Sequence, residues 1–93
     1  MPRPCKYRKI YGKPNSNYFK PAGVPINCLK ENQLILSEFE ALRLIYEKEL
    51  SQGDASKKMG ISQPTFSRIL NSAIKKISDA IITGKAIKIK WNY

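Results

Sequence analysis

The 93 residues of the chain make one domain, and 17 Lys and Arg against 7 Asp and Glu leave a net charge of +10, an excess typical of proteins that bind a polyanion. The absence of His, of a phosphate-binding glycine loop and of paired catalytic carboxylates argues against an enzyme, and no cofactor is expected. No apolar signal segment follows Met1 and no apolar run reaches membrane-spanning length, so we expect a cytoplasmic protein.

The two cysteines, Cys5 and Cys28, lie far apart in the sequence. Without His, two isolated thiols are too few ligands for a closed zinc site, and no metal is expected. Free thiols are the expectation in a cytoplasmic chain, and a metal or redox role for the two cysteines is the weaker alternative.

Charge is unevenly distributed along the chain. Residues 1–30 carry seven basic and no acidic side chains, residues 31–50 carry five acids and two bases, residues 51–84 carry five bases and two acids, and the last nine residues add three lysines. We divide the single domain into a basic extended arm and turn segment (1–30), a helix-turn-helix region (31–84) and a C-terminal strand (85–93). The expected fold class is mainly α, with a three-helix core.

Three prolines discourage helix at the start of the chain, where basic residues alternate with apolar ones. One interpretation is an extended arm that binds DNA phosphates or enters a minor groove through Arg3, Lys6, Arg8 and Lys9. The alternative is a solvated tail with a short edge strand near residues 7–11.

A short apolar run at residues 33–36 predicts a strand, and the support helix of the domain follows it. Ser37 is expected to cap this helix, with Glu40 completing a capping box. Apolar residues then recur at helical spacing as far as residues 48–50, where the helix ends.

The central motif is a short helix at residues 52–59, a turn, and a long helix that begins at Ser62. Gly60 can adopt the left-handed conformation that ends the first helix, and Ser62 is a good N-cap for the second. Pro64 lies in the first turn of the second helix, where its missing N–H costs little. This pattern is typical of a helix-turn-helix, which places its second helix in the major groove of DNA.

The outer face of the second helix carries four polar side chains that can read base edges: Gln63, Ser67, Arg68 and Asn71. Phosphate contacts are expected from neighbouring hydroxyls and lysines, namely Ser62, Thr65, Lys75 and Lys76. The alternative interpretation is an ordinary helical hairpin with a solvated face.

The second helix keeps its apolar period to residue 83, which is longer than groove reading requires. Its second half must bury Ile77 and Ile81 against either the support helix or a second subunit, so a homodimer is one expectation. Gly84 ends the helix, and residues 85–91 alternate between apolar and basic. That alternation predicts a half-buried strand pairing with residues 7–11 or 33–36.

Residues 36–44, 50–51, 59–62 and 65–70 together resemble region four of the sigma-seventy family, the helix-turn-helix that reads an upstream promoter element. The similarity spans about half of the chain. It implies a DNA-binding fold and, because that region also docks on RNA polymerase, it implies the polymerase as a second kind of partner.

A further resemblance covers nearly the whole chain. The chain is similar to a family of small prokaryotic proteins predicted to bind DNA through sigma region-four-like helices. The motifs that carry this similarity lie at residues 1–4 (Met-Pro-Arg-Pro), 19–25 (Phe-Lys-Pro-Ala-Gly-Val-Pro), 40–44 (Glu-Ala-Leu-Arg-Leu), 59–70 and 84–87 (Gly-Lys-Ala-Ile). Pro64 and residues 52–54 depart from the family pattern.

The primary hypothesis is a sequence-specific transcriptional regulator that binds double-stranded DNA. The second hypothesis is a protein that binds RNA polymerase. It would use the acidic residues in the support helix and just after it, namely Glu38, Glu40, Glu47 and Glu49. Binding of single-stranded RNA by the basic arm and its aromatic residues is the third alternative.

Overall fold

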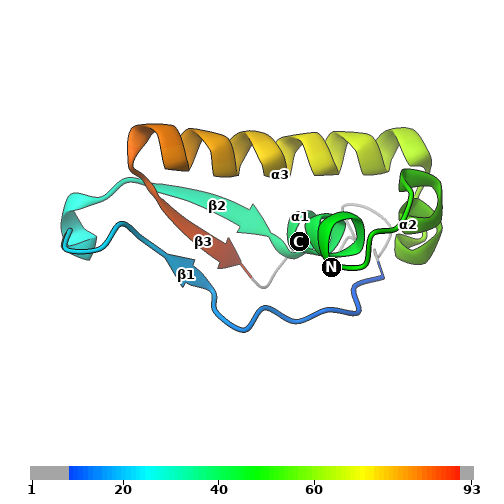
Figure 1. Ribbon diagram of the computed structural model, residues 1–93, viewed down its shortest axis with the longest axis horizontal. Coiled ribbons are helices and arrows are strands. Elements are labelled where there is room, and N and C mark those ends of the chain that lie inside the picture. Colours follow the sequence, from blue (N-terminus) through cyan, green and yellow to red (C-terminus); the bar gives the residue numbers. More distant parts are fainter. Residues whose placement is uncertain (1–8, 91–93) are drawn as a thin grey trace, which may run out of the picture.

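The computed structural model of the chain describes residues 9–90. In chain order its elements are β1 (Tyr18–Phe19), η1 (Ile26–Cys28), β2 (Glu31–Ile35), α1 (Leu36–Leu42), η2 (Arg43–Glu47), α2 (Gln52–Met59), α3 (Gln63–Thr83) and β3 (Ala86–Lys90). η1 is a single helical turn, and η2 is a π-helical turn that continues α1. The strands lie below the C-terminal half of α3, and α1 and α2 lie below its N-terminal half (Figure 1).

The three strands form one mixed sheet in the order β1–β3–β2. β3 pairs antiparallel with β1 and parallel with β2, so that Ile87 is opposite Phe19 and Ile89 is opposite Leu34. The fold is therefore mixed α/β, and the expectation of a mainly α protein is corrected. The predicted C-terminal strand and its pairing with residues 33–36 are confirmed. The alternative edge strand fails at residues 9–11, which form no strand.

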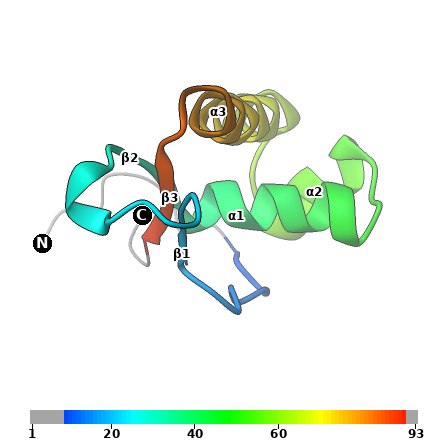
Figure 2. The ribbon, with the colours of Figure 1, turned by 60° about the vertical axis from the view of Figure 1, so that its left-hand side comes forward.

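Within residues 9–90, α3 covers one face of the sheet (Figure 2). Leu34 and Ile89 are buried on the face below α3, and Asn32 on the same face donates from its Nδ2 to Lys76 O (2.8 Å) in α3. The opposite face carries exposed side chains, among them Gln33 and Lys88. The view in Figure 2 shows α3 above the strands and α1, so the domain is a two-layer structure.

Two apolar clusters form the core. One lies between α1, η2, α2 and the first half of α3, and consists of Ala41, Leu44, Ala55, Met59, Phe66 and Leu70. The other joins the sheet and the start of α1 to the middle of α3, and consists of Leu34, Leu36, Ala73 and Ile89. Leu42 packs against both clusters, so α1 connects the helical half of the core to the sheet half.

α1 begins before Ser37, and the predicted capping box is wrong. Ile35 is the N-cap residue, and its N–H donates to the carboxylate of Glu38 (Oε1, 3.1 Å). Ser37 is fully buried, and its Oγ has no hydrogen-bond partner within the described residues. The physical reason is that β2 runs directly into α1, which leaves no loop from which Ser37 could cap.

Replacing Phe66 by Ala tests the helical half of this core. Phe66 is fully buried, so truncation should leave a cavity and lower the free energy of unfolding by about 3–5 kcal/mol. Urea unfolding followed by circular dichroism measures the loss. Ile26→Ala is the control, because Ile26 is 59% exposed and its truncation should cost less than about 0.5 kcal/mol. Equal losses in the two variants would contradict this description of the core.

Candidate nucleic-acid interface

The turn between α2 and α3 is built by local capping, as predicted. Gly60 adopts the left-handed conformation (φ 69°, ψ 34°) at the end of α2. Ser62 precedes α3 with extended backbone, and its Oγ accepts a hydrogen bond from Thr65 N (3.3 Å). Ile61, between Gly60 and Ser62, packs against the apolar cluster between α1, η2, α2 and the first half of α3. These contacts hold two helices on either side of a short turn, with the start of α3 at the surface.

A polar stripe runs along the outer side of the first half of α3. We define it by four exposed residues, Gln63, Arg68, Asn71 and Lys75. Their side chains make no hydrogen bond or ion pair that the structure records between residues 9 and 90. With a rise of 1.5 Å per residue the stripe is about 18 Å long. It presents amide and guanidinium groups, the donor and acceptor types that read base edges in a major groove.

Three other predicted contact residues, Ser62, Thr65 and Ser67, already form side-chain hydrogen bonds within the protein. Ser67 is half-buried, and its Oγ donates to Oε1 of Gln52 in α2 (2.6 Å). The hydroxyl of Ser62 donates to Oγ1 of Thr65 (2.9 Å). The bond of Ser67 joins α3 to α2, and the bond of Ser62 lies within the N-terminal cap of α3, so a contact with nucleic acid would have to share or replace these hydrogen bonds.

Lys76 lies away from the polar stripe. Its Nζ pairs with Glu38 Oε1 (3.0 Å) and donates to the backbone carbonyl of Gln33 (2.8 Å). Glu38 is buried and also accepts a hydrogen bond from Ser72 Oγ (2.6 Å). Lys75 and Lys76 are adjacent in sequence, but consecutive residues of a helix point about 100° apart. Lys76 therefore covers the edge of β2, and Lys75 faces outward.

The described part of the arm lies against the α2–α3 turn. Lys9 N donates to Met59 O (3.1 Å), and the Lys9 side chain passes 3.8 Å from the place where a Cβ on Gly60 would be. Lys58 Nζ lies 5.6 Å from the centre of the Tyr11 ring, within the range of a cation–π contact. Lys9 is thus held beside the start of α3, whereas Arg3, Lys6 and Arg8 lie outside the described residues.

A buried carboxylate attaches the arm to α1. Glu40 is fully buried, and it accepts hydrogen bonds from Tyr11 N (3.1 Å) and Gly12 N (3.0 Å). The guanidinium of Arg43 binds the same carboxylate through Nε (2.9 Å) and Nη2 (2.8 Å). We call Glu40, Arg43 and the two arm N–H groups the arm clasp. A Cβ on Gly12 would overlap Arg43 Nε and Cδ, so the clasp requires glycine there.

The clasp shifts the pKa of Glu40. Burial raises the pKa of this carboxyl, but the bonds from Arg43, Tyr11 N and Gly12 N outweigh burial, and the pKa lies below its ordinary value of 4.5. The clasp was not predicted from the sequence, where Glu40 was assigned to a capping box. The available signal was Arg43 three residues after an acidic residue, together with a lone glycine in the basic arm.

Nearly the whole chain matches a known family. Residues 1–92 match the model described as "Protein of unknown function DUF134". The chain belongs to this family. A UPF0251 protein of Dehalococcoides mccartyi is 50% identical over 90 residues, which are 97% of this chain and 77% of that protein. A UPF0251 protein of Moorella thermoacetica is 47% identical over 93 residues, which are 100% of this chain and 62% of that protein. No solved structure matches the chain.

The match confirms the similarity expected along nearly the whole chain, and DNA binding by this DUF134 member stays a prediction. Between residues 9 and 90 no group of three His, Cys, Asp or Glu side chains could hold a metal ion, and Cys28 is an exposed free thiol. Cys5 lies outside that range. No helix in the described part of the chain is long and apolar enough to cross a membrane.

Glu40→Gln should destabilise the protein in a pH-dependent way. A folded-state pKa below 4.5 means that the carboxylate stabilises the fold above pH 4.5 and that this contribution is lost as the pH falls through the folded-state pKa. At neutral pH the variant should lose about 2–3 kcal/mol, because Arg43 is left without its charged partner. Urea unfolding of both proteins between neutral and acidic pH should show this difference shrinking below pH 4.5. A difference that is the same at every pH would contradict the clasp.

Gly12→Ala tests the same clasp with the carboxylate intact. The added methyl group meets Arg43, so the arm should detach and the free energy of unfolding should fall by about 1–3 kcal/mol. Amide hydrogen exchange at Tyr11 and Gly12 should become faster. Asn17→Ala is the control within the arm, because the Asn17 side chain is exposed and its loss should leave the exchange at Tyr11 unchanged.

Proposed function

We propose that the protein binds double-stranded DNA through a helix-turn-helix formed by α2 and α3, and that it acts as a sequence-specific transcriptional regulator. The observation that carries the proposal is the polar stripe. Its four side chains have no recorded partner within the described part of the chain, and a well-capped helix holds three of them, Arg68, Asn71 and Lys75, within about 60° of one another on its outer side. A helix presented in this way fits a major groove, which is wide enough to admit it.

The charge of the chain supports a polyanionic partner. A net charge of +10 over 93 residues favours association with phosphates at any sequence. Lys75 would meet a phosphate at the far end of the stripe, and Ser62 and Thr65 would meet one at the start of α3, where helix N–H groups also favour an anion. Lys76 contributes less, because its ammonium group is paired with Glu38.

The arm would add a second set of contacts. Arg8 directly precedes Lys9, and Arg3 is six residues before it, which an extended chain spans in about 20 Å. Because Lys9 is held at the α2–α3 turn, these basic side chains start from a point beside the proposed reading helix. An arm in this position would track the backbone or enter the minor groove next to the major groove that α3 occupies.

The resemblance of residues 36–70 to sigma region four supports the same proposal, and it also keeps RNA polymerase as a proposed partner. The acidic surface suggested for that partner is smaller than predicted. Glu38 and Glu40 are buried in the fold, which leaves Glu47 and Glu49 exposed. RNA binding has less support, because the hydroxyl of Tyr18, one of the arm aromatics, bonds Glu31 (2.8 Å) at the sheet.

Two substitutions in the stripe should have different effects. Arg68→Ala should cost about 1–3 kcal/mol on a selected duplex and little on random DNA, because it removes a base contact. Lys75→Ala should weaken binding to all duplexes alike and reduce the slope of log K against log salt by about 1, because it removes a phosphate contact. Lys88→Ala removes the same charge from the solvent face of the sheet and should leave the salt slope unchanged. Fluorescence anisotropy over a salt series measures all three.

The proposal fails if the selected and random duplexes bind with equal affinity at every salt concentration. A specific regulator should prefer its selected duplex by about a thousandfold or more. Equal losses from Lys75→Ala and Lys88→Ala would show that general charge, and not the stripe on α3, determines binding.

A further inference from the structure

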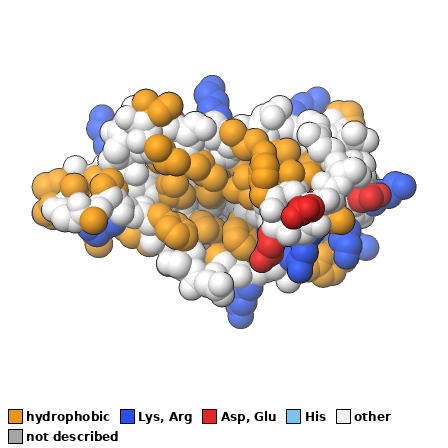
Figure 3. Space-filling model, viewed as in Figure 1, with side chains coloured by type: hydrophobic (Ala, Val, Ile, Leu, Met, Phe, Trp, Pro, Cys, Tyr) orange, Lys and Arg blue, Asp and Glu red, His pale blue; other side chains and the backbone are white. Residues whose placement is uncertain are grey.

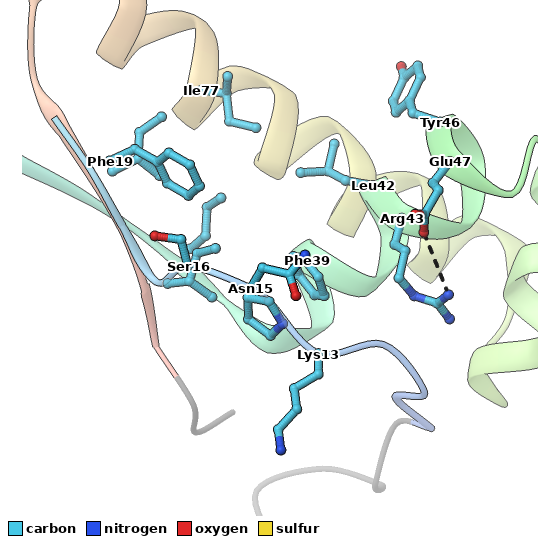
Figure 4. A pocket seen from close by; sticks show the side chains of 14 residues that line it. Lys13, Asn15, Ser16, Phe19, Phe39, Leu42, Arg43, Tyr46, Glu47 and Ile77 are labelled. Atoms are coloured by element: carbon cyan, nitrogen blue, oxygen red, sulfur yellow. Dashed lines mark ion pairs between the residues drawn. The ribbon is translucent and has the colours of Figure 1, made fainter. Parts of the chain in front are cut away.

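An open apolar groove lies beside α3. It is on the side of the helix opposite Lys76, which covers the edge of β2. Its volume is about 790 Å³. Figure 3 shows apolar side chains gathered in this hollow below α3, and Figure 4 shows Phe19, Leu42 and Ile77 pointing into it from the sheet, α1 and α3. Ile87 and Ile89 of β3 form its floor. The rim is polar, with Lys13 and an ion pair between Arg43 and Glu47 (3.9 Å).

The groove exists because a single helix covers a three-stranded sheet. α3 lies over β2 and the β2 side of β3, where Leu34 and Ile89 are buried. No helix of the described residues lies above the side of the sheet nearer β1, so Phe19 is 52% exposed although it is on the same face as Ile87. The apolar face of the sheet therefore extends beyond the part that α3 covers.

The adjoining half of α3 is also apolar and exposed. Ile81 is 74% exposed and Ile82 is 81% exposed. Ile81 is one turn after Ile77 and lies on the same side of the helix, so it extends the apolar wall of the groove. From residue 77 to residue 84 the only charged side chain is Asp79, which is held by Lys85 Nζ (2.7 Å) and Asn32 Nδ2 (2.9 Å). On a chain with a net charge of +10, this segment does not repel another copy.

We propose that a second copy of the chain covers this face, with segment 77–82 of each α3 packed antiparallel against the other and against the groove. A two-fold interface requires a surface that is complementary to itself. This surface is self-complementary, because the exposed Ile81 lies one turn after Ile77, which lines the apolar hollow, and each copy offers both the side chain and the hollow. The functional role of this dimer rests on the proposed DNA binding, whereas the contacts of its interface do not.

The arrangement leaves the polar stripe accessible. On a helical wheel Ile81 lies about 100° from the mean direction of Asn71 and Lys75. The interface is therefore at the side of α3, and the stripes of both copies can face the same duplex. The centres of the stripe and of segment 77–82 are separated by about 16 Å along α3, so two antiparallel copies place their stripes about 32 Å apart. Successive turns of the major groove are about 34–36 Å apart.

Sedimentation-velocity ultracentrifugation without DNA tests the interface. The wild-type chain should shift from monomer to dimer with rising concentration, and Ile81→Glu should weaken self-association about tenfold or more. Because Ile81 is exposed, this variant should still fold, which circular dichroism verifies. Ile26→Glu adds the same charge at another exposed isoleucine outside the groove lining and should dimerise like wild type.

The outcomes separate this proposal from the proposed function. A wild-type chain that stays monomeric at all concentrations overturns the dimer, even if it binds DNA or if its groove takes up a small apolar molecule or another protein. A dimer that Ile81→Glu leaves intact overturns the assigned surface. A dimer that breaks as expected but binds no DNA supports the interface and refutes DNA binding. If both hold, moving two inverted half-sites apart by about half a helical turn should weaken binding of wild type but not of Ile81→Glu.

Discussion

Two buried carboxylates on one short helix hold the molecule together. Glu38 and Glu40 are two residues apart, so they leave α1 on nearly opposite sides. Glu38 binds the start of α1, Ser72 and Lys76, which connects the sheet edge to α3. Glu40 binds the arm and Arg43. A buried carboxylate is stable only when charged and polar partners satisfy it, so each one fixes the segments that supply those partners.

Local signals in the sequence predicted the helices well. The ends of α2 and α3 depend on Ser51, Gly60, Ser62 and Gly84, whose effects act within one turn of the chain. The alternation in β3 was likewise visible. The apolar run at residues 33–36 also predicted β2 and its pairing with β3. Only β1 was missed, because it has two residues and pairs with a strand that is distant in sequence. Ser37 was misplaced because no local feature shows that β2 continues directly into α1.

The candidate site was predicted to a similar extent. Helical periodicity was enough to place Gln63, Arg68, Asn71 and Lys75 on the outer face of α3, where the structure has them exposed. Their role remains a hypothesis. Periodicity could not show that Lys76 is paired with Glu38 or that Glu40 holds the arm, since both contacts depend on residues brought together by tertiary packing. Buried acids are rare enough that surface exposure was the natural expectation for both carboxylates.

The position of β3 also constrains how the chain is made. Among the described residues, β1 and β2 each pair only with β3, which lies between them in the sheet. β3 is also the last of the described elements along the chain. During translation the sheet therefore cannot close until the ribosome has released β3, whereas α1, η2, α2 and the first half of α3 can already assemble their own cluster. A nascent chain would thus expose the apolar faces of β2 and α3 for a time, and factors that shield such surfaces at the ribosome would have their greatest effect on the sheet half of this domain.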